Sequence, residues 1–374
     1  MRVLVLNAGS SSLKASVLDS DGLAAMAQVE VSLGTDASRG RGVVGPVRSA
    51  LKQLGQTTSM DSVEAVGHRV VHGGMRFRQP VRVTPSVVRA IDQLSEFAPL
   101  HNPVAAATIR AAQAILKPKP HVAAFDTAFH ASLPEAAYIY PVPSQWSRDW
   151  KIRRFGFHGL SVEWSMGRAA QLLQVPPEEL SLIVAHLGSG ASVTAVLDGR
   201  TVDTSMGLTP LEGLMMGTRA GSIDPGIILY ALRKKRLSAL RLEKQLWHES
   251  GLIAVAGRKA GMRELEVAQQ KGNKPARLAI DIFVHRAAAG IAAAATSLPR
   301  IDALVFTGGI GENSASIRAA ILRRLAALGF AGIAAPEGGG DVLLTEPGWR
   351  PAVLRVRARE DAVIASQVSR LVGR

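Results

Sequence analysis

Val3-Leu4-Val5-Leu6-Asn7-Ala8-Gly9-Ser10-Ser11-Ser12-Leu13-Lys14 is the most informative stretch of this chain. Its apolar start predicts a buried strand, and a second strand is expected to end near residue 19. In the turn between them, Gly9 lets the backbone approach a ligand, and consecutive N–H groups with serine hydroxyls can surround phosphate oxygens. Lys14 adds a positive charge, and Asn7 can contact a cation. A lone Gly-Ser turn is more commonly an ordinary hairpin, so this stretch alone leaves both interpretations open.

A second copy of the pattern lies in the middle of the chain. The stretch 182–198 aligns without gaps with the stretch 3–19. In this alignment His186 corresponds to Asn7, and the two copies are 179 residues apart. A glycine, a serine and the closing Val-Leu-Asp recur at matching places. This separation is too wide for a solenoid repeat and indicates a duplicated domain. Two such hairpins predict one nucleotide held between two lobes.

Length and composition agree with a two-domain protein. A chain of 374 residues exceeds one typical core, and 47% hydrophobic residues are enough to bury two. No apolar run of membrane-spanning length is expected, and the apolar start of the chain is interrupted before it could form a signal sequence. The absence of cysteine excludes disulfides, thiolate metal sites and cysteine nucleophiles. We expect a cytoplasmic protein with no membrane partner.

The net charge of +14 raises the question of an acidic partner. Such a charge could attract nucleic acid or an anionic surface. Aromatic residues make up only 5% of the chain, however, and the basic residues are scattered along it. The dense run Arg233-Lys234-Lys235-Arg236 falls in a helical pattern and predicts a solvated face. We therefore expect no nucleic acid as a partner, and the positive charge suits an anionic substrate such as a nucleotide.

Strand and helix signals alternate along the chain and predict an α/β fold. The expected strands are 2–7, 13–19, 63–68, 121–125, 182–186, 192–198, 302–307 and 352–356. The expected helices are 85–97, 103–116, 161–173, 226–234, 239–247, 275–297 and 314–328. A loop is expected at 34–45, another at 338–340, and a closing helix at 361–371.

Polar clusters are expected where several strands end, which is where ligands gather in open α/β sheets. These clusters are Gly67–Gly74, Leu100–Pro103, Phe125–His130, Arg153–Gly159, Met216–Pro225 and Phe306–Asn313. The last one is a glycine-rich turn between a strand and a helix, which suits contact with a nucleotide. Each cluster alone has a structural explanation, such as a hydrogen-bonded histidine or a paired arginine. Together they suit phosphoryl transfer, which depends on positioning and charge neutralisation.

The motifs, in this order, resemble those of the acetate kinase (acetokinase) family over nearly the whole chain. The resemblance rests on Asn7–Lys14, His68–Gly74, Pro99–Pro103, Phe125–His130, Arg154–Gly159, Met216–Arg219, Ile223–Pro225 and Thr307–Asn313. It implies the superfamily of acetate and sugar kinases, heat-shock chaperones and actin, with two ribonuclease-H-like lobes around a cleft. The lobes would be 1–145, completed by the helix 361–374, and 146–360, which would carry the nucleotide site and a dimer interface. It also implies a homodimer, ATP as co-substrate, Mg²⁺ or Mn²⁺, and reversible formation of acetyl phosphate from acetate.

The resemblance also implies roles for individual residues. Asp126, His158 and Arg219 would be catalytic, and Asn7 and Glu360 would bind the metal. Arg69 would bind the substrate carboxylate, beside a pocket for its methyl group formed by Val71, Leu100, Phe157 and Pro210. The ATP site would comprise Ser10, Ser12, Lys14, His186, Leu187, Gly188, Ser189, Gly190, Gly261, Met262, Arg263, Gly309, Ile310, Gly311, Glu312 and Asn313.

Two positions depart from the family's usual pattern. Ser189 stands where the family usually has Asn, and Gly261 stands where it usually has Asp. Ser189 keeps a hydroxyl for phosphate but lacks an amide donor, and Gly261 lacks a carboxylate expected near the nucleoside. These changes would affect nucleotide affinity and the choice of base more than the chemistry.

The chemistry itself predicts how the carboxyl groups act. Acetate is ionised at neutral pH, so no proton has to be removed from it, and Asp126 is expected to position an arginine or a metal-bound water. We expect direct in-line transfer without a phosphoenzyme. Three alternatives remain: a propionate or butyrate kinase, a non-catalytic ATP-binding module, and a basic nucleic-acid binder. Retention of Asp126, His158 and Arg219 argues against the second, and no recognition motif supports the third.

Overall fold

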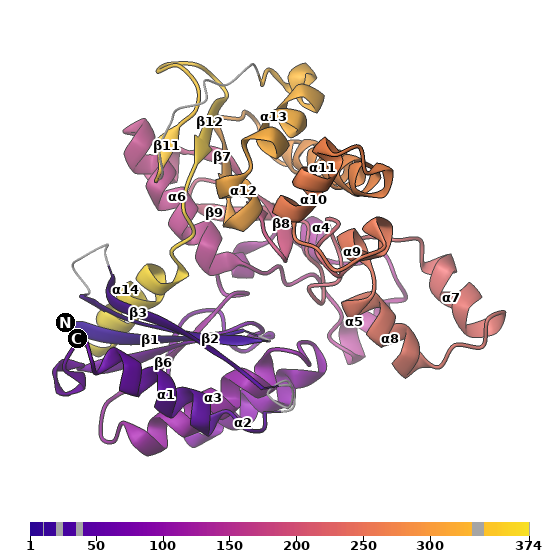
Figure 1. The fold of residues 1–374 in the computed structure, drawn as a ribbon. Helices are drawn as coiled ribbons and strands as arrows, with labels where there is room; N and C mark the ends of the chain where they lie inside the picture. The colour runs from indigo at the N-terminus through magenta and orange to yellow at the C-terminus, as the bar shows by residue number, and fades with distance from the viewer. Residues whose placement is uncertain (10, 20–24, 35–39, 331–339, 374) are drawn as a thin grey trace. The chain divides into compact units, whose positions relative to one another are not determined.

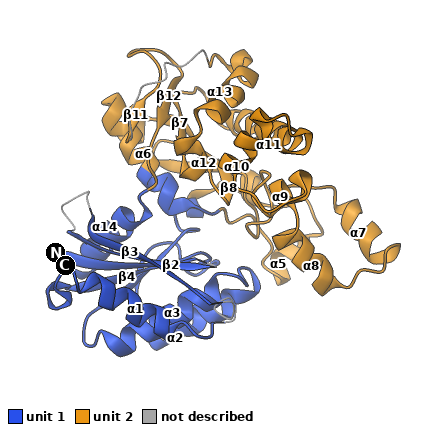
Figure 2. Ribbon diagram, in the orientation of Figure 1, with its two compact units in different colours: residues 1–131, 157–164, 359–374 blue, residues 132–156, 165–358 orange. Residues whose placement is uncertain are grey.

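The computed structural model describes residues 1–9, 11–19, 25–34, 40–330 and 340–373, and it contains two six-stranded sheets with helices packed on them (Figure 1). The chain divides into two compact units (Figure 2). Unit 1 comprises Met1–Ala131, Phe157–Trp164 and Arg359–Arg374, and unit 2 comprises Ser132–Gly156 and Ser165–Ala358. The C-terminal segment thus completes the N-terminal unit.

The sheet of unit 1 has the strand order β3-β2-β1-β4-β6-β5. Its strands are β1 (Arg2–Ala8), β2 (Ser12–Asp19), β3 (Ala25–Ser32), β4 (Ala65–Val70), β5 (Val81–Arg82) and β6 (His121–Phe125). The first three pair antiparallel, β1 pairs parallel with β4, β4 pairs parallel with β6, and β5 closes the edge antiparallel. The three parallel strands therefore end at the same edge of the sheet.

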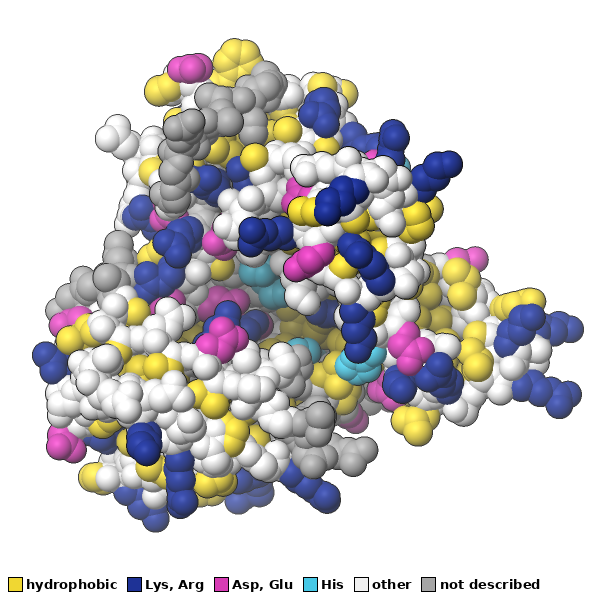
Figure 3. All heavy atoms as spheres, in the orientation of Figure 1, with side chains coloured by type: hydrophobic (Ala, Val, Ile, Leu, Met, Phe, Trp, Pro, Cys, Tyr) yellow, Lys and Arg dark blue, Asp and Glu magenta, His cyan; other side chains and the backbone are white. Residues whose placement is uncertain are grey.

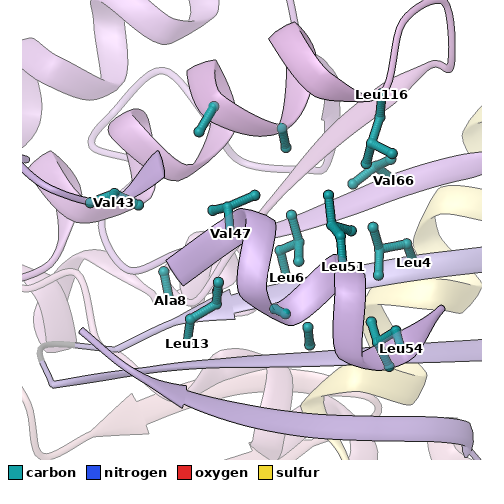
Figure 4. Close-up of a cluster of buried hydrophobic side chains, with 14 of the residues drawn as sticks. Leu4, Leu6, Ala8, Leu13, Val43, Val47, Leu51, Leu54, Val66 and Leu116 are labelled. Atoms are coloured by element: carbon teal, nitrogen blue, oxygen red, sulfur yellow. The ribbon is translucent and has the colours of Figure 1, made fainter. Parts of the chain in front are cut away.

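Helices cover both faces of this sheet because β1 is apolar on both sides. Leu4 and Leu6 belong to a buried cluster with α1 (Val44–Leu54) and α3 (Asn102–Ile115), shown in Figure 4. Val3 and Val5 point to the opposite face and pack with α14 (Glu360–Val372). Successive side chains of a strand alternate between its faces, so one short apolar run fills two cores. A further helix, α2 (Pro85–Gln93), packs against α3.

Unit 2 repeats the topology of unit 1. Its strand order, taken from the β9 edge, is β9-β8-β7-β10-β12-β11. The strands are β7 (Ser181–Leu187), β8 (Ala191–Leu197), β9 (Arg200–Thr204), β10 (Ala303–Thr307), β11 (Val342–Leu343) and β12 (Ala352–Arg355). Again three antiparallel strands are followed by two parallel pairings and a two-residue antiparallel edge strand. The duplication predicted from the two hairpins is thus confirmed by the whole sheet.

The remaining helices lie mainly in unit 2, and α6 passes from unit 1 into unit 2. They are α4 (Glu135–Tyr138), α5 (Ser144–Asp149), α6 (Gly159–Leu173), α7 (Pro225–Arg233), α8 (Ala239–His248), α9 (Gly251–Ala256), α10 (Met262–Gln270), α11 (Lys274–Ala295), α12 (Gly308–Asn313) and α13 (Ala315–Arg324). Short 3₁₀ turns occur at Met60–Ser62, Leu94–Glu96, Phe129–Ser132, Pro177–Glu179 and Ala326–Leu328.

The helix α11 is long and apolar enough to cross a membrane by length and composition, which the sequence analysis did not expect. Its buried residues include Phe283 and Ile291, and it packs against β7 and β8. A core helix passes the same test. The packing therefore accounts for the apolar character of α11.

Most expected elements form, and the departures have local causes. The strand β3 was not predicted. In the structure its residues alternate between half-buried and exposed, as expected of a strand with one covered face. The loop expected at 34–45 gives way to α1 at Val44, and residues 35–39 lie outside the described part of the chain. Most of the expected loop at 338–340 also lies outside it.

Basic side chains are spread over the face shown in Figure 3. The run 233–236 is exposed at the end of α7, which confirms the predicted solvated face. The basic character of the chain is thus not concentrated in one stripe on this face.

Candidate active site

Unit 1 gathers four polar side chains at the common edge where its parallel strands end. Asn7 lies near the end of β1, Arg69 near the end of β4, and Asp126 directly follows β6. Glu360 is the first residue of α14 and reaches the same edge. These are the two residues predicted to bind metal, the predicted substrate-binding arginine and the predicted catalytic carboxylate.

Arg69 is the centre of this cluster. Its Nε and Nη2 donate to the two oxygens of Asp126, at 2.9 and 2.6 Å. Its Nη1 lies 3.2 Å from Asn7 Oδ1 and 3.3 Å from Glu360 Oε2. Asn7 Nδ2 in turn donates to Glu360 Oε2 at 3.0 Å. A bidentate arginine–carboxylate pair fixes the guanidinium plane as well as its position.

The charged groups of this cluster interact strongly because they are shielded from solvent. Burial raises the pKa of the Asp126 carboxyl to about 6, and the Arg69 guanidinium acts against this rise. Burial alone would lower the pKa of Arg69, but the carboxylates of Asp126 and Glu360 outweigh it and raise that pKa above its ordinary value. Arg69 is therefore charged at neutral pH. Since both Asp126 oxygens face Arg69, the geometry suits an orienting role for Asp126, as the sequence analysis expected.

The backbone around Asp126 also fixes the approach of α6. Asp126 N donates to Val70 O at 3.0 Å, and Gly159 N donates to Asp126 O at 2.9 Å. A Cβ on Gly159 would overlap with Asp126 O, so only glycine fits there. The preceding residue, His158, has a φ of 59°, in the left-handed region that non-glycine residues rarely adopt. Such strain is found where the surrounding structure holds a side chain for a purpose.

Three of the four residues predicted for the methyl pocket belong to one local cluster in unit 1. Val71 and Phe157 are buried, and the Phe157 ring packs edge-on against His72, 5.4 Å between ring centroids. Asn102 Oδ1 accepts from His72 N at 3.1 Å, and its Nδ2 donates to His72 O at 3.0 Å. This ties the turn that carries Val71 to the start of α3, two residues after Leu100. Pro210, the fourth predicted residue, lies in unit 2.

In unit 2, the second hairpin turn lies beside the glycine-rich first turn of α12, which begins directly after β10. His186 and Thr307 are register partners on the parallel strands β7 and β10. Gly308 has a φ of 78°, and a Cβ there would lie 2.8 Å from Leu187 O, so this turn requires glycine. A Cβ on Gly309 would meet nothing within 4 Å, and the Thr307 hydroxyl is buried without a partner in the described residues. The turn thus offers an open backbone face, as contact with a ligand requires.

The third predicted nucleotide segment lies at the start of α10. Glu266 Oε1 accepts from Ser314 Oγ at 2.7 Å, which ties α10 to the residue that follows α12. Met262 is buried, so its side chain belongs to the core. A Cβ on Gly261 would lie 2.8 Å from Glu264 Oε2. The carboxylate of Glu264 thus occupies the direction in which the family's usual Asp would extend.

The first hairpin supplies the remaining candidates. Gly9 N donates to Ser12 O at 2.8 Å and closes the turn. The Ser12 hydroxyl donates to Glu30 on β3 at 2.7 Å, and Lys14 is exposed on β2. Ser10 lies outside the described residues.

Arg219 is half-buried and has an unusual environment for an arginine in such a place. Its Nη1 donates to Pro210 O at 2.7 Å, and its guanidinium lies 5.7 Å from the centre of the Trp247 ring. Within the described part of the chain no carboxylate forms an ion pair with it, and desolvation lowers the pKa of Arg219 to about 10. A partly desolvated cation held only by neutral groups is costly to maintain, and it is suited to an incoming anion.

A glycine keeps the Arg219 turn in place. Gly251, with a φ of 69°, packs against this turn so closely that a Cβ would overlap with Met216 O and lie 2.7 Å from Arg219 O. Ser250 N donates to Thr218 O at 3.0 Å on the same side.

We expect Gly251→Ala to displace the Arg219 turn and to lower kcat about tenfold or more, because backbone atoms cannot move aside cheaply. Gly257→Ala is the matched control, since Gly257 also has a φ of 69° but a Cβ there would meet nothing within 4 Å. The measurement is kcat together with the temperature of thermal unfolding. Equal losses in the two variants would show that backbone strain alone, and not the Arg219 turn, is responsible.

The residues predicted as sites therefore fall into two groups, and each group is gathered within its own unit. Asn7, Arg69, Asp126, Glu360, Val71, Leu100, Phe157, His158, Ser12 and Lys14 lie in unit 1. His186–Gly190, Pro210, Arg219, Gly261–Arg263 and Gly309–Asn313 lie in unit 2. The supporting role of Asn102 was not predicted, although Asn102 lies in the polar cluster Leu100–Pro103.

Asn7 and Glu360 carry the ligand types that Mg²⁺ prefers, an amide oxygen and a carboxylate. In this structure Arg69 Nη1 lies 3.2 Å from Asn7 Oδ1 and 3.3 Å from Glu360 Oε2, so a cation bound there would share these oxygens with the guanidinium. Among the described residues no group of three or more His, Cys, Asp or Glu side chains could hold a metal by itself. Mg²⁺ commonly keeps several waters and takes further ligands from substrate phosphates, so this small donor set suits it.

Comparison with known proteins gives consistent matches over the full chain. The model of the acetokinase family matches residues 2–366. An acetate kinase of Deinococcus radiodurans is 45% identical over 395 residues, covering 100% of this chain and 98% of that protein. Among solved structures, the acetate kinase of Porphyromonas gingivalis has a TM-score of 0.88 at 31% identity, and a propionate kinase from Francisella tularensis has 0.86 at 34%. Each covers 99% of both chains. The predicted two-domain, ribonuclease-H-like fold is thereby confirmed.

Proposed function

The chain belongs to the acetokinase family, and from this premise we propose that it transfers the γ-phosphoryl group of ATP reversibly to acetate, giving acetyl phosphate and ADP. It is a kinase with a carboxyl group as acceptor. The observation that carries the proposal is Arg219, a half-buried guanidinium held by a carbonyl and an indole, with no described carboxylate paired to it. A highly anionic transferring group is the partner that such a site lacks.

The reaction is governed by charge repulsion. An acetate carboxylate must approach a γ-phosphoryl group that is itself anionic, and no proton has to be removed from either. Arg69, oriented by Asp126, would bind the acetate carboxylate. Arg219 and His158 would stabilise the transferring phosphoryl group as its charge spreads in the transition state. We infer direct in-line transfer, because the chemistry needs positioning rather than a covalent intermediate.

We propose ATP as the co-substrate and Mg²⁺ as the metal. The turns at 188–190 and 308–311, together with Lys14, would hold the phosphates, and the segment 261–263 would lie near the nucleoside. Asn7 and Glu360 would hold the metal, with Mn²⁺ as an alternative to Mg²⁺. When bound, the metal would neutralise phosphate charge.

A coupled assay tests this function. ADP release is followed with purified protein, ATP, Mg²⁺ and acetate, and separately with propionate, butyrate and GTP. We expect acetate-dependent ADP release that requires the metal. Folded, metal-supplied protein that releases no ADP above background with any of the acids would refute the proposal.

Propionate kinase is the second candidate, because a propionate kinase is among the similar structures. The choice should depend on the size of the methyl pocket at Val71, which is buried beside His72 and Phe157. Removing two methyl groups makes room for one more methylene in the substrate, which is worth roughly 1–3 kcal/mol in such a pocket. We expect Val71→Ala to raise the ratio of kcat/KM for propionate over acetate about tenfold.

Val70→Ala is the control for this variant. It removes the same two methyl groups from the neighbouring core cluster that contains Phe125, so it should lower stability without changing the ratio. An unchanged ratio in Val71→Ala would show that Val71 does not line the acyl pocket.

We also propose a homodimer that forms through α7 and α8. Several large apolar side chains are exposed on these helices: Ile227, Leu229, Tyr230, Leu232 and Leu240. Figure 3 shows hydrophobic side chains, in yellow, exposed in this part of unit 2. Exposed apolar side chains grouped on neighbouring helices are typical of a protein–protein interface. Because ATP is a cytoplasmic co-substrate, we propose a cytoplasmic location, without a membrane or nucleic acid as partner.

A further inference from the structure

We propose that Glu212 is a positioning residue for phosphoryl transfer, acting through the loop 205–213 that holds Arg219. The proposal rests on the function proposed above. It concerns unit 2 only, where Glu212, the loop and Arg219 all lie. Glu212 would not touch the substrate; it would fix the place of the Pro210 carbonyl, to which Arg219 donates its hydrogen bond.

Glu212 joins two donors that come from another part of the chain. Arg154 Nη2 donates to Glu212 Oε1 at 2.8 Å, and the Tyr140 hydroxyl donates a short hydrogen bond to Glu212 Oε2. The Arg154 guanidinium also lies 5.4 Å from the centre of the Tyr140 ring. Burial is the largest cause that raises the pKa of Tyr140, with the Glu212 carboxylate adding to it, so the phenol stays a neutral donor. We call Tyr140, Arg154 and Glu212 the loop clamp.

The loop clamp is bonded to the loop along its length. Arg154 Nη1 donates to Thr204 O and Ser205 O, both at 3.1 Å. The Tyr140 hydroxyl accepts from Leu208 N at 3.1 Å. Phe155 N adds a hydrogen bond of 3.0 Å to the carbonyl of Gly207.

Glycine at position 207 shows how closely the clamp sits on the loop. A Cβ there would overlap with Glu212 Oε2 and with the Tyr140 hydroxyl. The loop can therefore pack against the clamp in only one way. This packing fixes the position of the Pro210 carbonyl. Among the described residues this carbonyl is the only hydrogen-bond partner of the Arg219 guanidinium, so Arg219 depends on the loop for its position.

The loop also has space into which it could move if the hydrogen bonds of the loop clamp were removed. A cavity of about 370 Å³ lies beside it, lined by Tyr140, Leu208, Thr209, Leu211 and Glu212, among others. Removing the Glu212 carboxylate would leave the half-buried Arg154 guanidinium and the Tyr140 hydroxyl without their acceptor. Both donors would then form hydrogen bonds with other groups, and the hydrogen bonds that fix the loop would be lost. A shift of about 1 Å in a positioned group can cost on the order of 10²-fold in rate.

The test compares Glu212→Ala, Glu212→Gln, Arg219→Ala and the double variant Glu212→Ala/Arg219→Ala in the assay described above. We expect Glu212→Ala to lower kcat about tenfold or more, with the KM for ATP within about twofold. Glu212→Gln should recover part of the rate, because its amide oxygen still accepts one hydrogen bond. If Glu212 acts through Arg219, the double variant should be no slower than Arg219→Ala alone, within about twofold.

Asp341→Ala is the matched control. Asp341 forms an ion pair with Arg168 at 2.6 Å in the same unit, is less exposed than Glu212, and has no part in the loop clamp. We expect its kcat to stay within about twofold of the unmodified protein, and thermal unfolding checks that each variant is folded. If Glu212→Ala does not fold, Glu212→Gln alone decides, since its kcat must still fall.

The outcomes separate this inference from the proposed function. An inactive unmodified protein refutes the function. An active one in which Glu212→Ala and Glu212→Gln keep full kcat overturns the inference. The inference is also overturned if the double variant shows the full product of the two single losses, because Glu212 would then act independently of Arg219.

Discussion

Replacing Arg219 with alanine should lower kcat for acetate about 10²-fold or more, with a smaller effect on ATP binding. The guanidinium is held in place before the reaction by Pro210 and faces the Trp247 ring, so its charge is available to the transition state without rearrangement. Stability should not fall. Removing a half-buried cation that has no described carboxylate partner relieves part of a desolvation cost, so the unfolding temperature should stay about equal. Steady-state kinetics and thermal unfolding measure the two effects.

Arg219→Lys is the control that separates charge from geometry. Lysine keeps the positive charge but cannot reproduce the planar, forked donor arrangement of arginine. We expect its kcat to lie between those of the unmodified protein and Arg219→Ala. Normal turnover in Arg219→Ala would remove this residue from the catalytic role.

Replacing Arg69 with alanine should abolish activity and also destabilise unit 1. The guanidinium is the partner of both Asp126 oxygens and lies 3.3 Å from Glu360. Without it, two carboxylates would face each other in a largely buried place. Breaking a buried pair in this way costs about 3–5 kcal/mol. The measurement is the shift of the first unfolding transition in urea.

A compensating substitution gives the control. In Arg69→Met with Asp126→Asn, the guanidinium is replaced by an apolar side chain and one carboxylate by an amide, so most of the lost stability should return. Activity should not return, because the acetate carboxylate would still lack its arginine. If Arg69→Ala unfolds in the same urea range as the unmodified protein, the Arg69–Asp126 ion pair contributes little to the stability of unit 1.

Much of the fold could be predicted from local patterns. The alternating apolar residues of β1, the glycine turn after it and the copy beginning near Leu182 are all short-range features, and they predicted two related units. The polar residues at strand ends were equally predictable, since parallel strands end at one edge of a sheet. Hence Asn7, Arg69 and Asp126 were expected near a ligand.

Other features depend on contacts that no short window of sequence contains. Glu360 meets Asn7 across 353 positions because α14 returns to the first sheet. Glu212 bonds to Tyr140, 72 positions earlier, and its own neighbours in the sequence carry no motif. The place of Arg154 in a quoted motif did not reveal that its guanidinium holds the carbonyls of Thr204 and Ser205.

The sequence by itself determined the two hairpins, the duplication and the residue types at the strand ends, because periodicity, turn chemistry and strand direction act over a few residues. Only the tertiary structure decided which charges are paired. Asp126 is neutralised by Arg69, whereas Arg219 is held by the carbonyl of Pro210 and the ring of Trp247. Pairing and burial depend on distances between remote segments, and these distances set the charge that a half-buried arginine can offer to an anionic substrate.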